Sequence, residues 1–359
     1  MIYIIAEIGV NHNGSFAIAK KMIGEAKKAG ANAVKFQNFI PEEMTLKSTE
    51  KAKYQKKNTA IKETHYEMLE KYTLTEEEYV LLKKVAKSHG IDFISTPFDY
   101  KSLIFLLKKL KLSTIKISST DIDNVPLLIK AGASNKNIII SSGMSTIDDV
   151  DIALSALAYG NKKFSKNFKL KQHKYFYKRN LQYLQKKVTL MHCTSEYPAP
   201  LDELNLNVLD SYKERYNINI GYSDHSCDAL TPIIATSKGI SSIEVHVTLN
   251  KKMSGPDHLS SLTFNDFRKY IKNIRKSEVI LGNKKKVVTK SESKNIKVAR
   301  KSLVISKGIS KHDKLSENNL TSKRPGSGIS PRYYFEFINK KVNKNITKDS
   351  ILQKYFIQK

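Results

Sequence analysis

The first 280 residues of this 359-residue chain predict a TIM (β/α)8 barrel, because eight short strand-like runs alternate with stretches of helical period. Eight such units at this length favour a closed barrel, and an open doubly wound sheet is the competing architecture. The predicted strands are Tyr3–Glu7, Ala33–Gln37, Asp92–Ser95, Thr114–Ile117, Asn137–Ser141, Val188–His192, Asn219–Tyr222 and Ser242–His246.

Helical segments fill the intervals between these strands. Apolar residues recur at helical spacing in Phe16–Ala29, Thr75–Ser88 opens with a Thr-x-x-Glu capping box, and Phe264–Leu281 supplies an eighth helix. Two segments interrupt the alternation. We expect the long polar connection 41–73 to be an active-site lid. The Lys-, Phe- and Tyr-rich stretch 160–187 is expected to form a surface excursion or an extra helix.

A small β-rich domain is expected after the barrel. Residues 1–282 would form the barrel, 283–294 a basic linker, and 295–359 the second domain. Two similar stretches that begin at Gly308 and Val342 contain short β-like runs between Gly, Pro and Asn turns.

Basic residues dominate two parts of a chain whose formal charge is +28. Residues 284–359 hold 20 Lys/Arg against 5 Asp/Glu, and residues 161–187 add ten basic residues and no acidic one. These side chains are scattered without a recognised motif. A solvated, Lys-rich surface that favours anionic substrates is therefore expected, rather than a nucleic-acid interface.

Composition also bounds the location of the protein. Only Cys193 and Cys227 are present, too few to indicate a secreted disulfide scaffold. The run from Ile2 to Val10 contains Glu7 and lacks preceding basic residues, which favours a buried strand over a signal peptide. No apolar run approaches the length of a membrane span. We expect a cytoplasmic protein without a membrane partner.

Two histidines at neighbouring strand ends indicate a metal site. His225 and His246 lie 21 residues apart, which is about one βα unit, so both are expected at the same mouth of a barrel. A pair of imidazoles there suits a first-row divalent ion. The competing interpretation is that both histidines are structural. Asp224 could orient a metal-bound histidine or cap a helix.

The remaining strand ends carry groups that suit an oxyanion and a hydroxyl-rich substrate. They are Glu7, Lys35, Lys116, Ser118, Ser119, Ser141, Ser142 and the stretch His192–Tyr197. Lysines supply point charges, and hydroxyl groups bind phosphate or carboxylate oxygens. The alternatives are a structural ion pair for Glu7, helix capping for the serines, and core packing for Cys193.

Several motifs together resemble the sialic acid synthases, in the same order along the whole chain. They are Ala6-Glu7-Ile8-Gly9-Val10-Asn11-His12-Asn13-Gly14, Val34-Lys35-Phe36-Gln37, His192-Cys193-Thr194-Ser195-Glu196-Tyr197-Pro198, Gly221-Tyr222-Ser223-Asp224-His225, Glu244-Val245-His246 with Gly255-Pro256-Asp257-His258, and Arg324-Pro325-Gly326-Ser327-Gly328. The resemblance implies a TIM barrel followed by an antifreeze-like (SAF) domain. It also implies a homodimer in which that domain covers the barrel of the partner.

The implied reaction joins phosphoenolpyruvate to N-acetylmannosamine, or a related acylamino-mannose, and gives N-acetylneuraminate and phosphate. The alternative substrate is a 2,4-diacetamido-6-deoxy hexose, as in legionaminic or, less well matched, pseudaminic acid synthases. The resemblance assigns a divalent ion, Mn2+ first and Mg2+ or Co2+ as substitutes, to His225 and His246, and catalysis to these two residues and Glu7. The implied substrate-binding residues are Lys35, Lys116, Ser119, Ser141, Ser195, Tyr197, Ser223, Asp257 and Arg324.

Two other classes remain as competing predictions. A Schiff-base aldolase would use Lys116 or Lys35 as the amine, and would be trapped by borohydride with pyruvate. A non-catalytic basic protein would bind nucleic acid in a salt-sensitive manner that survives loss of both histidines.

Overall fold

The computed structural model describes residues 1–59, 61–162 and 167–358, and the chain divides into two compact units, Met1–Gly282 and Asn283–Lys359. In the first unit eight parallel strands pair in sequence order, and β1 also pairs with β8, which closes the barrel. The predicted TIM barrel is thus confirmed. The strands are β1 (Tyr3–Gly9), β2 (Ala33–Asn38), β3 (Asp92–Pro97), β4 (Thr114–Ile117), β5 (Asn137–Ser141), β6 (Val188–Cys193), β7 (Asn219–Asp224) and β8 (Ser242–Thr248), with a short β9 (Leu262–Thr263) beside β8.

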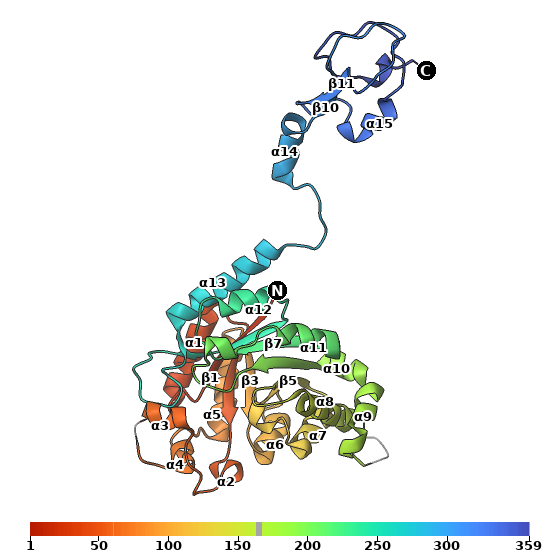
Figure 1. Ribbon diagram of the computed structural model, residues 1–359. Helices are drawn as coiled ribbons and strands as arrows, with labels where there is room; N and C mark the ends of the chain where they lie inside the picture. The colour runs from red at the N-terminus through yellow and green to blue at the C-terminus, as the bar shows by residue number, and fades with distance from the viewer. Residues whose placement is uncertain (60, 163–166, 359) are drawn as a thin grey trace. The chain divides into compact units, whose positions relative to one another are not determined.

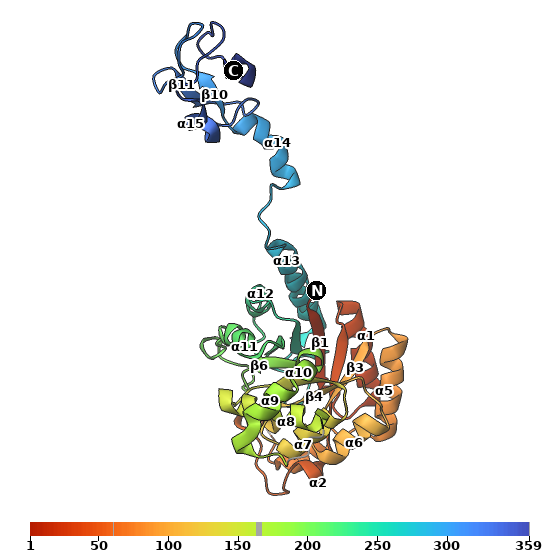
Figure 2. The ribbon, with the colours of Figure 1, turned by 90° about the vertical axis from the view of Figure 1, so that its right-hand side faces the viewer.

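Helices surround these strands, as Figures 1 and 2 show from two directions. Those that cover the barrel are α1 (Phe16–Ala29), α5 (Glu76–Ser88), α6 (Tyr100–Lys108), α7 (Val125–Ala133), α8 (Ile147–Lys162), α11 (Val208–Tyr216), α12 (Thr231–Ser237) and α13 (Phe264–Leu281). Their starts follow ordinary capping chemistry. Thr75 caps α5 through the predicted capping box with Glu78, and Thr263 caps α13.

The barrel interior holds an apolar layer below its mouth. Inward-facing side chains of alternate strand residues form a separate cluster there, consisting of Ile5, Ala33, Ile94, Ile139 and Met191 packed with Tyr3. A larger core lies between the strands and the helices. Because side chains alternate along a strand, the next inward positions towards the carboxyl ends emerge above this layer. Those positions carry the polar residues of the mouth.

The two interruptions of the barrel have different structures. The connection 41–73 forms α2 (Pro41–Met44), α3 (Lys53–Thr59) and α4 (His65–Glu70). The basic stretch 160–187 holds α9 (His173–Arg179) and α10 (Leu181–Lys187); its residues 163–166 lie outside the described part. Asn180 donates from Nδ2 to the Ala158 carbonyl at 3.0 Å, which attaches the excursion to α8. Among the described residues, no helix is both long and apolar enough to cross a bilayer.

The second unit has its own small core. It contains α14 (Lys290–Ala299), the antiparallel pair β10 (Ser302–Ile305) and β11 (Leu320–Lys323), and α15 (Tyr334–Phe337). The two similar stretches pair with each other: the backbone amides of Ile309 and Ile346 each donate to the other residue's carbonyl, at 3.0 and 2.9 Å. Helix α14 begins within the predicted 283–294 linker, because Thr289 and Glu292 form a capping box.

Candidate active site

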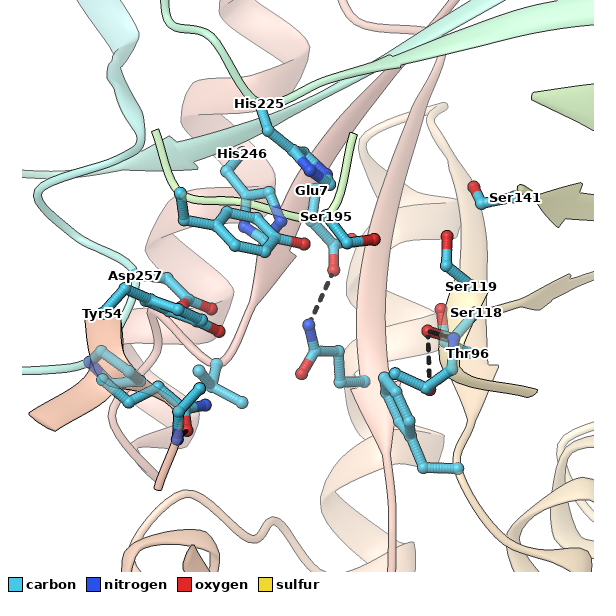
Figure 3. Close-up of a pocket in the computed structure, with 18 of the residues that line it drawn as sticks. Glu7, Tyr54, Thr96, Ser118, Ser119, Ser141, Ser195, His225, His246 and Asp257 are labelled. Carbon is cyan, nitrogen blue, oxygen red and sulfur yellow. Dashed lines mark hydrogen bonds between the residues drawn. The ribbon is translucent and has the colours of Figure 1, made fainter. Parts of the chain in front are cut away.

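A cavity of about 470 Å³ opens at the carboxyl ends of the barrel strands. It is lined by eleven of the twelve residues that the sequence singled out, and Figure 3 labels seven of them. The eleven are Glu7, Lys35, Lys116, Ser119, Ser141, Ser195, Tyr197, Ser223, His225, His246 and Asp257. Residues from seven different strands or strand ends therefore meet in one pocket, as the barrel geometry requires.

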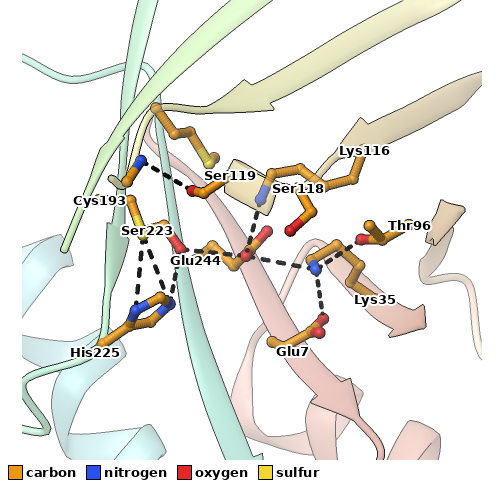
Figure 4. Close-up of polar contacts among 12 residues, drawn as sticks. Glu7, Lys35, Thr96, Lys116, Ser118, Ser119, Cys193, Ser223, His225 and Glu244 are labelled. Carbon is orange, nitrogen blue, oxygen red and sulfur yellow. Dashed lines mark hydrogen bonds and ion pairs between the residues drawn. The ribbon is translucent and has the colours of Figure 1, made fainter. Parts of the chain in front are cut away.

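Four buried charges form a cluster at the base of the cavity (Figure 4). Strand register places Glu7 beside Lys35, and their charged atoms are 3.0 Å apart. Glu244 lies 3.2 Å from the Lys116 ammonium and 3.5 Å from that of Lys35. All four side chains are at most 5% exposed. Glu7 thus makes the ion pair that we considered structural, but it does so on the wall of the pocket.

The two carboxylates of this cluster differ in proton affinity. Burial raises the pKa of Glu7 to about 7, although Lys35 opposes the shift. Burial acts in the same direction on Glu244, but Lys116 and Lys35 outweigh it and lower its pKa to about 2. Glu244 is therefore a fixed anion, whereas Glu7 can exchange a proton near neutral pH.

His225 and His246 lie together on neighbouring strands, with ring centroids 5.6 Å apart. Nδ1 of His225 is 2.7 Å from the Thr194 carbonyl, so it donates there, and its Nε2 has only the long contacts of Ser223 Oγ at 3.4 Å and Cys193 Sγ at 3.8 Å among the described residues. Nδ1 of His246 is buried and has no hydrogen-bond partner among the described residues. Burial, His225 and Lys35 hold the pKa of His246 well below its usual value, so it stays neutral.

These observations fit a divalent metal ion. A metal ion binds the lone pair of a neutral imidazole; His246 is held neutral with a partnerless Nδ1, and the carbonyl contact of His225 is a typical orienting interaction. No group of three or more His, Cys, Asp or Glu side chains suited to a metal occurs in the described part of the chain. Water or substrate oxygens would therefore complete the coordination of such an ion.

Tyr197 covers the histidine pair. Its ring stacks on His225 at 4.2 Å and meets His246 edge-on at 5.4 Å. Cys193 is buried, and its Sγ lies 3.6 Å from Nδ1 of His225. Asp224 contacts neither histidine ring through a recorded hydrogen bond: it accepts from Ser226, Thr231 and Tyr270 and shapes the turn after His225. Asp228, not Asp224, accepts the backbone amides at the start of α12.

Hydroxyl groups gather at the ends of β4 and β5, opposite the histidines in Figure 3. Ser119 Oγ accepts from the Gly143 amide at 2.9 Å, and Ser141 Oγ is buried without a partner among the described residues. A Cβ on Gly143 would lie 2.1 Å from Ser195 Oγ, so any larger residue there would displace that hydroxyl group. Ser118 caps a short 3-10 helix, which is the alternative role that the sequence analysis gave to these serines. Together with Lys35 and Lys116, these groups can hold a phosphate or carboxylate.

The segment 41–73 closes one side of the cavity. The ring of Tyr54 in α3 packs against that of Tyr197 in a tilted arrangement, with a centroid distance of 5.1 Å. Asn58 donates from Nδ2 to the Pro256 carbonyl at 2.7 Å, which fastens α3 to the loop after β8. The segment expected to be a lid therefore supplies part of the pocket wall.

The pocket residues that were given no role from the sequence include Glu244, Gln37, Thr96 and Tyr54. Strand alternation was a usable signal for Glu244, because Ser242, Glu244 and His246 must face the same side of β8. Gln37 is likewise two residues beyond Lys35, and its amide lies 3.3 Å from Glu7 Oε1. No pattern distinguished Tyr54 within its polar segment.

Arg324 is the twelfth predicted residue, and it belongs to the second unit. It is exposed and follows β11 directly, at the start of the loop that contains Gly326 and Gly328. Its place at the barrel mouth of a partner subunit stays a prediction.

The fold and the pocket together define an enzyme: a (β/α)8 barrel whose mouth combines an anion-binding end, a proton-exchanging carboxylate and a histidine pair. Comparisons with known proteins identify the family of this enzyme. The model of the NeuB family matches residues 22–286, and that of the SAF domain matches residues 300–356. The chain belongs to the NeuB family of nonulosonic acid synthases, which confirms the resemblance to sialic acid synthases and the expected SAF domain.

Three relatives illustrate the similarity. The N,N'-diacetyllegionaminic acid synthase of Campylobacter jejuni is 40% identical over 350 residues, 98% of each chain. The enzyme of the same name from Legionella pneumophila is 35% identical over 98% of this chain and 93% of its own. The crystal structure of N-acetylneuraminic acid synthetase from Leptospira borgpetersenii superposes with a TM-score of 0.65 at 29% identity, covering 82% of this chain and 90% of that one.

Proposed function

We propose that this enzyme condenses phosphoenolpyruvate with a 2,4-diacetamido-6-deoxymannose and releases N,N'-diacetyllegionaminic acid and phosphate. The observation that carries this substrate is the 40% identity, over 98% of both chains, to a protein with that product in its name. The sequence analysis placed N-acetylmannosamine first and the diacetamido sugar second. The similarity to two legionaminic acid synthases favours the second substrate.

The anion-binding end of the pocket is suited to phosphoenolpyruvate. Lys35 and Lys116 would neutralise its phosphate and carboxylate, while Ser119 and Ser141 would donate hydrogen bonds to their oxygens. The unused hydroxyl of Ser141 and the close approach allowed by Gly143 support this placement. Glu244 keeps both ammonium groups in place between turnovers, because it already contacts each of them.

His225 and His246 would hold a divalent ion, Mn2+ in the first instance, with Mg2+ or Co2+ as substitutes. When bound, such an ion supplies Lewis-acid polarisation of the sugar's aldehyde oxygen. The protein's own contribution is to orient His225 through its Thr194 contact and to keep His246 neutral through burial.

Glu7 is proposed as the general base that accepts a proton from the attacking water. Bond formation between C3 of phosphoenolpyruvate and the aldehyde carbon leaves cationic character at C2. Water adds at C2 and gives a proton to the Glu7 carboxylate, while the former aldehyde oxygen takes up one proton from solvent and becomes a hydroxyl. The tetrahedral intermediate then breaks the C2–O bond to phosphate, and its C2 hydroxyl gives its proton to the departing phosphate as the ketone forms. A carboxyl whose pKa is raised to about 7 can accept that proton and return it to solvent at neutral pH.

Sugar hydroxyls would be bound by Ser195, Tyr197, Ser223 and Asp257, all of which line the pocket. We also propose that the enzyme is a homodimer in which Arg324 of one subunit reaches the acylamino group in the other. An exposed arginine on a Gly- and Pro-rich loop supports this role, since its guanidinium is free to meet a ligand carbonyl.

The aldolase alternative is less consistent with the pocket. A Schiff base needs an unprotonated amine, but Glu244 and Glu7 raise the pKa of Lys35 against the effect of burial. Burial does lower the pKa of Lys116, so borohydride trapping with pyruvate remains a direct test of that residue.

The first experiment is phosphate release from phosphoenolpyruvate with Mn2+ present. Parallel reactions would contain N-acetylmannosamine, the 2,4-diacetamido-6-deoxymannose or no sugar. Release that depends on the diacetamido sugar and stops with EDTA is the expected result. Release with N-acetylmannosamine alone would restore neuraminate as the product, and no release from folded enzyme with any sugar would contradict the proposed reaction.

A further inference from the structure

A small apolar cluster, separate from the main core, borders the cavity on the side of the 41–73 segment. Its buried members Val10, Met68 and Leu69 pack with the partly buried Met44, Tyr72 and Phe98. All six side chains also line the cavity. We call these six residues the apolar wall. Such a surface inside a pocket otherwise rich in charges and hydroxyls can bind a hydrocarbon group.

The segment that carries most of this wall is held in place by buried polar contacts. Lys51 is nearly fully buried, and its ammonium donates to Thr59 Oγ1 and to the Ile61 carbonyl, both at 2.7 Å. It also pairs with Glu63 at 3.1 Å. A buried ammonium with three partners is well compensated. The wall is therefore formed without a substrate and can select among substrates.

The direction in which the sugar extends follows from the other groups of the pocket. The aldehyde carbon must meet phosphoenolpyruvate near Glu7 and the histidine pair, and the β4–β5 end is taken by the phosphate-binding hydroxyls. The chain of the open sugar then extends towards Asp257 and Tyr54, which Figure 3 shows together on the opposite side. Tyr54 belongs to the 41–73 segment that also bears Met44 and Met68.

We infer that the apolar wall is the specificity element for the sugar, and that it binds the methyl group at C6. This inference rests on the proposed function and adds which group of the sugar, the C6 substituent, contacts the 41–73 segment. A 6-hydroxyl against these side chains would lose its water without gaining a partner. A 6-phosphate would meet the same surface at a larger cost, because it is charged.

The test compares two sugars that differ only at C6. The specificity constant kcat/KM is measured with the 2,4-diacetamido-6-deoxymannose and with its 6-hydroxy analogue. An apolar pocket discriminates a single such group by about 10- to 100-fold, and we expect the wild-type enzyme to favour the deoxy sugar by that factor. Met44→Gln keeps the side-chain length and offers a polar partner, so it should reduce the ratio at least about 5-fold.

Controls make the ratio interpretable. Because both sugars are measured on the same enzyme sample, the ratio is independent of how much of a variant is folded. Met68→Gln tests a second position in the wall, and Leu46→Gln, an exposed residue of the same segment, should leave the ratio unchanged. A wild-type ratio near one, or an unchanged ratio in both wall variants, would overturn the inference. The proposed function would survive that result, since it fails only if neither diacetamido sugar supports phosphate release.

Discussion

Glu244 lies between two buried ammonium groups and is itself 3% exposed. Placing three such charges in a barrel interior is costly, and their mutual attraction offsets the cost only while every member is present. Glu244 also accepts from Ser223 at 3.2 Å, which connects it to the strand that carries His225. Its first role is therefore to offset the free-energy cost of burying the two lysine ammonium groups in the folded protein.

We expect Glu244→Gln to lower the free energy of unfolding by about 3 kcal/mol, because it leaves Lys35 and Lys116 undercompensated. Urea unfolding followed by circular dichroism measures this change. Glu196→Gln, which alters an exposed carboxylate nearby, should change stability by no more than about 0.5 kcal/mol. The double variant Glu244→Gln/Lys116→Met should be more stable than Glu244→Gln alone. If it is less stable, the ion pair does not account for the loss.

His12 provides a pH-dependent contribution to stability. Burial lowers its pKa from 6.5 to about 4, and its Nδ1 accepts from the Gly14 amide, which requires the neutral ring. Since the folded pKa is below the unfolded one, this stabilisation is complete above about pH 6.5 and is lost as the pH falls towards 4.

Acidification from about pH 7.5 to pH 5 should therefore cost about 2 kcal/mol of stability through His12. Unfolding curves of wild type and His12→Gln at the two pH values test this, since the variant should lack that increment. His312→Gln, at an exposed histidine of the second unit, should retain the wild-type pH dependence. Equal pH dependence in wild type and His12→Gln would refute the assignment.

At the level of elements, the 41–73 segment depends on one buried side chain. Lys51 joins residues from the end of α3 and the approach to α4, so its removal should loosen the whole segment. The end of the pocket that we propose for phosphate is built on β2, β4 and β5 and does not involve this contact.

Lys51→Met should accordingly raise KM for the sugar about 10-fold or more and leave KM for phosphoenolpyruvate within about 2-fold of wild type. Hydrogen exchange of residues 41–73 should become faster in the variant. Lys57→Met, an exposed lysine in α3, is the matched control. A parallel rise of both KM values would indicate damage to the barrel rather than to the segment.

Most of the barrel could be predicted because its signals are local. Apolar runs located all eight strands, and the predicted helices Phe16–Ala29 and Phe264–Leu281 match α1 and α13 residue for residue. Strand ends were underestimated: β1 extends to Gly9, which pairs with Phe36 of β2, and β8 extends to Thr248, which pairs with Thr263 of β9. A local pattern does not reveal such distant partners.

The pocket was predictable where a residue type is unusual for its position, as with Lys35 at the end of an apolar strand. It was not predictable where the role depends on residues distant in sequence. Glu244 becomes a counter-ion only because β8 meets β1 and β7, and Tyr54 enters the pocket only because α3 is fastened to Pro256. The start of α14 was not predicted, although the Thr-x-x-Glu pattern of its capping box, Thr289 to Glu292, is present in the sequence.

On the scale of the whole molecule, the pocket of each subunit is proposed to need Arg324 from its partner. Mixing inactive Glu7→Gln with Arg324→Ala should then restore activity, because a mixed dimer has one site with both residues intact. With free exchange of subunits, about 25% of wild-type activity is expected. The two variants assayed separately are the controls. No recovery, with subunit exchange shown by mass spectrometry of labelled chains, would place Arg324 in its own subunit's site or in none.

The apolar layer of Ile5, Ala33, Ile94, Ile139 and Met191 has a consequence for the order of events in each turnover. It blocks the barrel below the charged cluster, so the pocket has a single entrance. In the proposed binding mode phosphoenolpyruvate lies deepest, so a sugar bound first would stand in its way. The small anion should therefore enter before the sugar, and the nine-carbon acid should leave before phosphate. The order of substrate binding and product release would thus depend on the apolar layer below the pocket as well as on the residues that perform the chemistry.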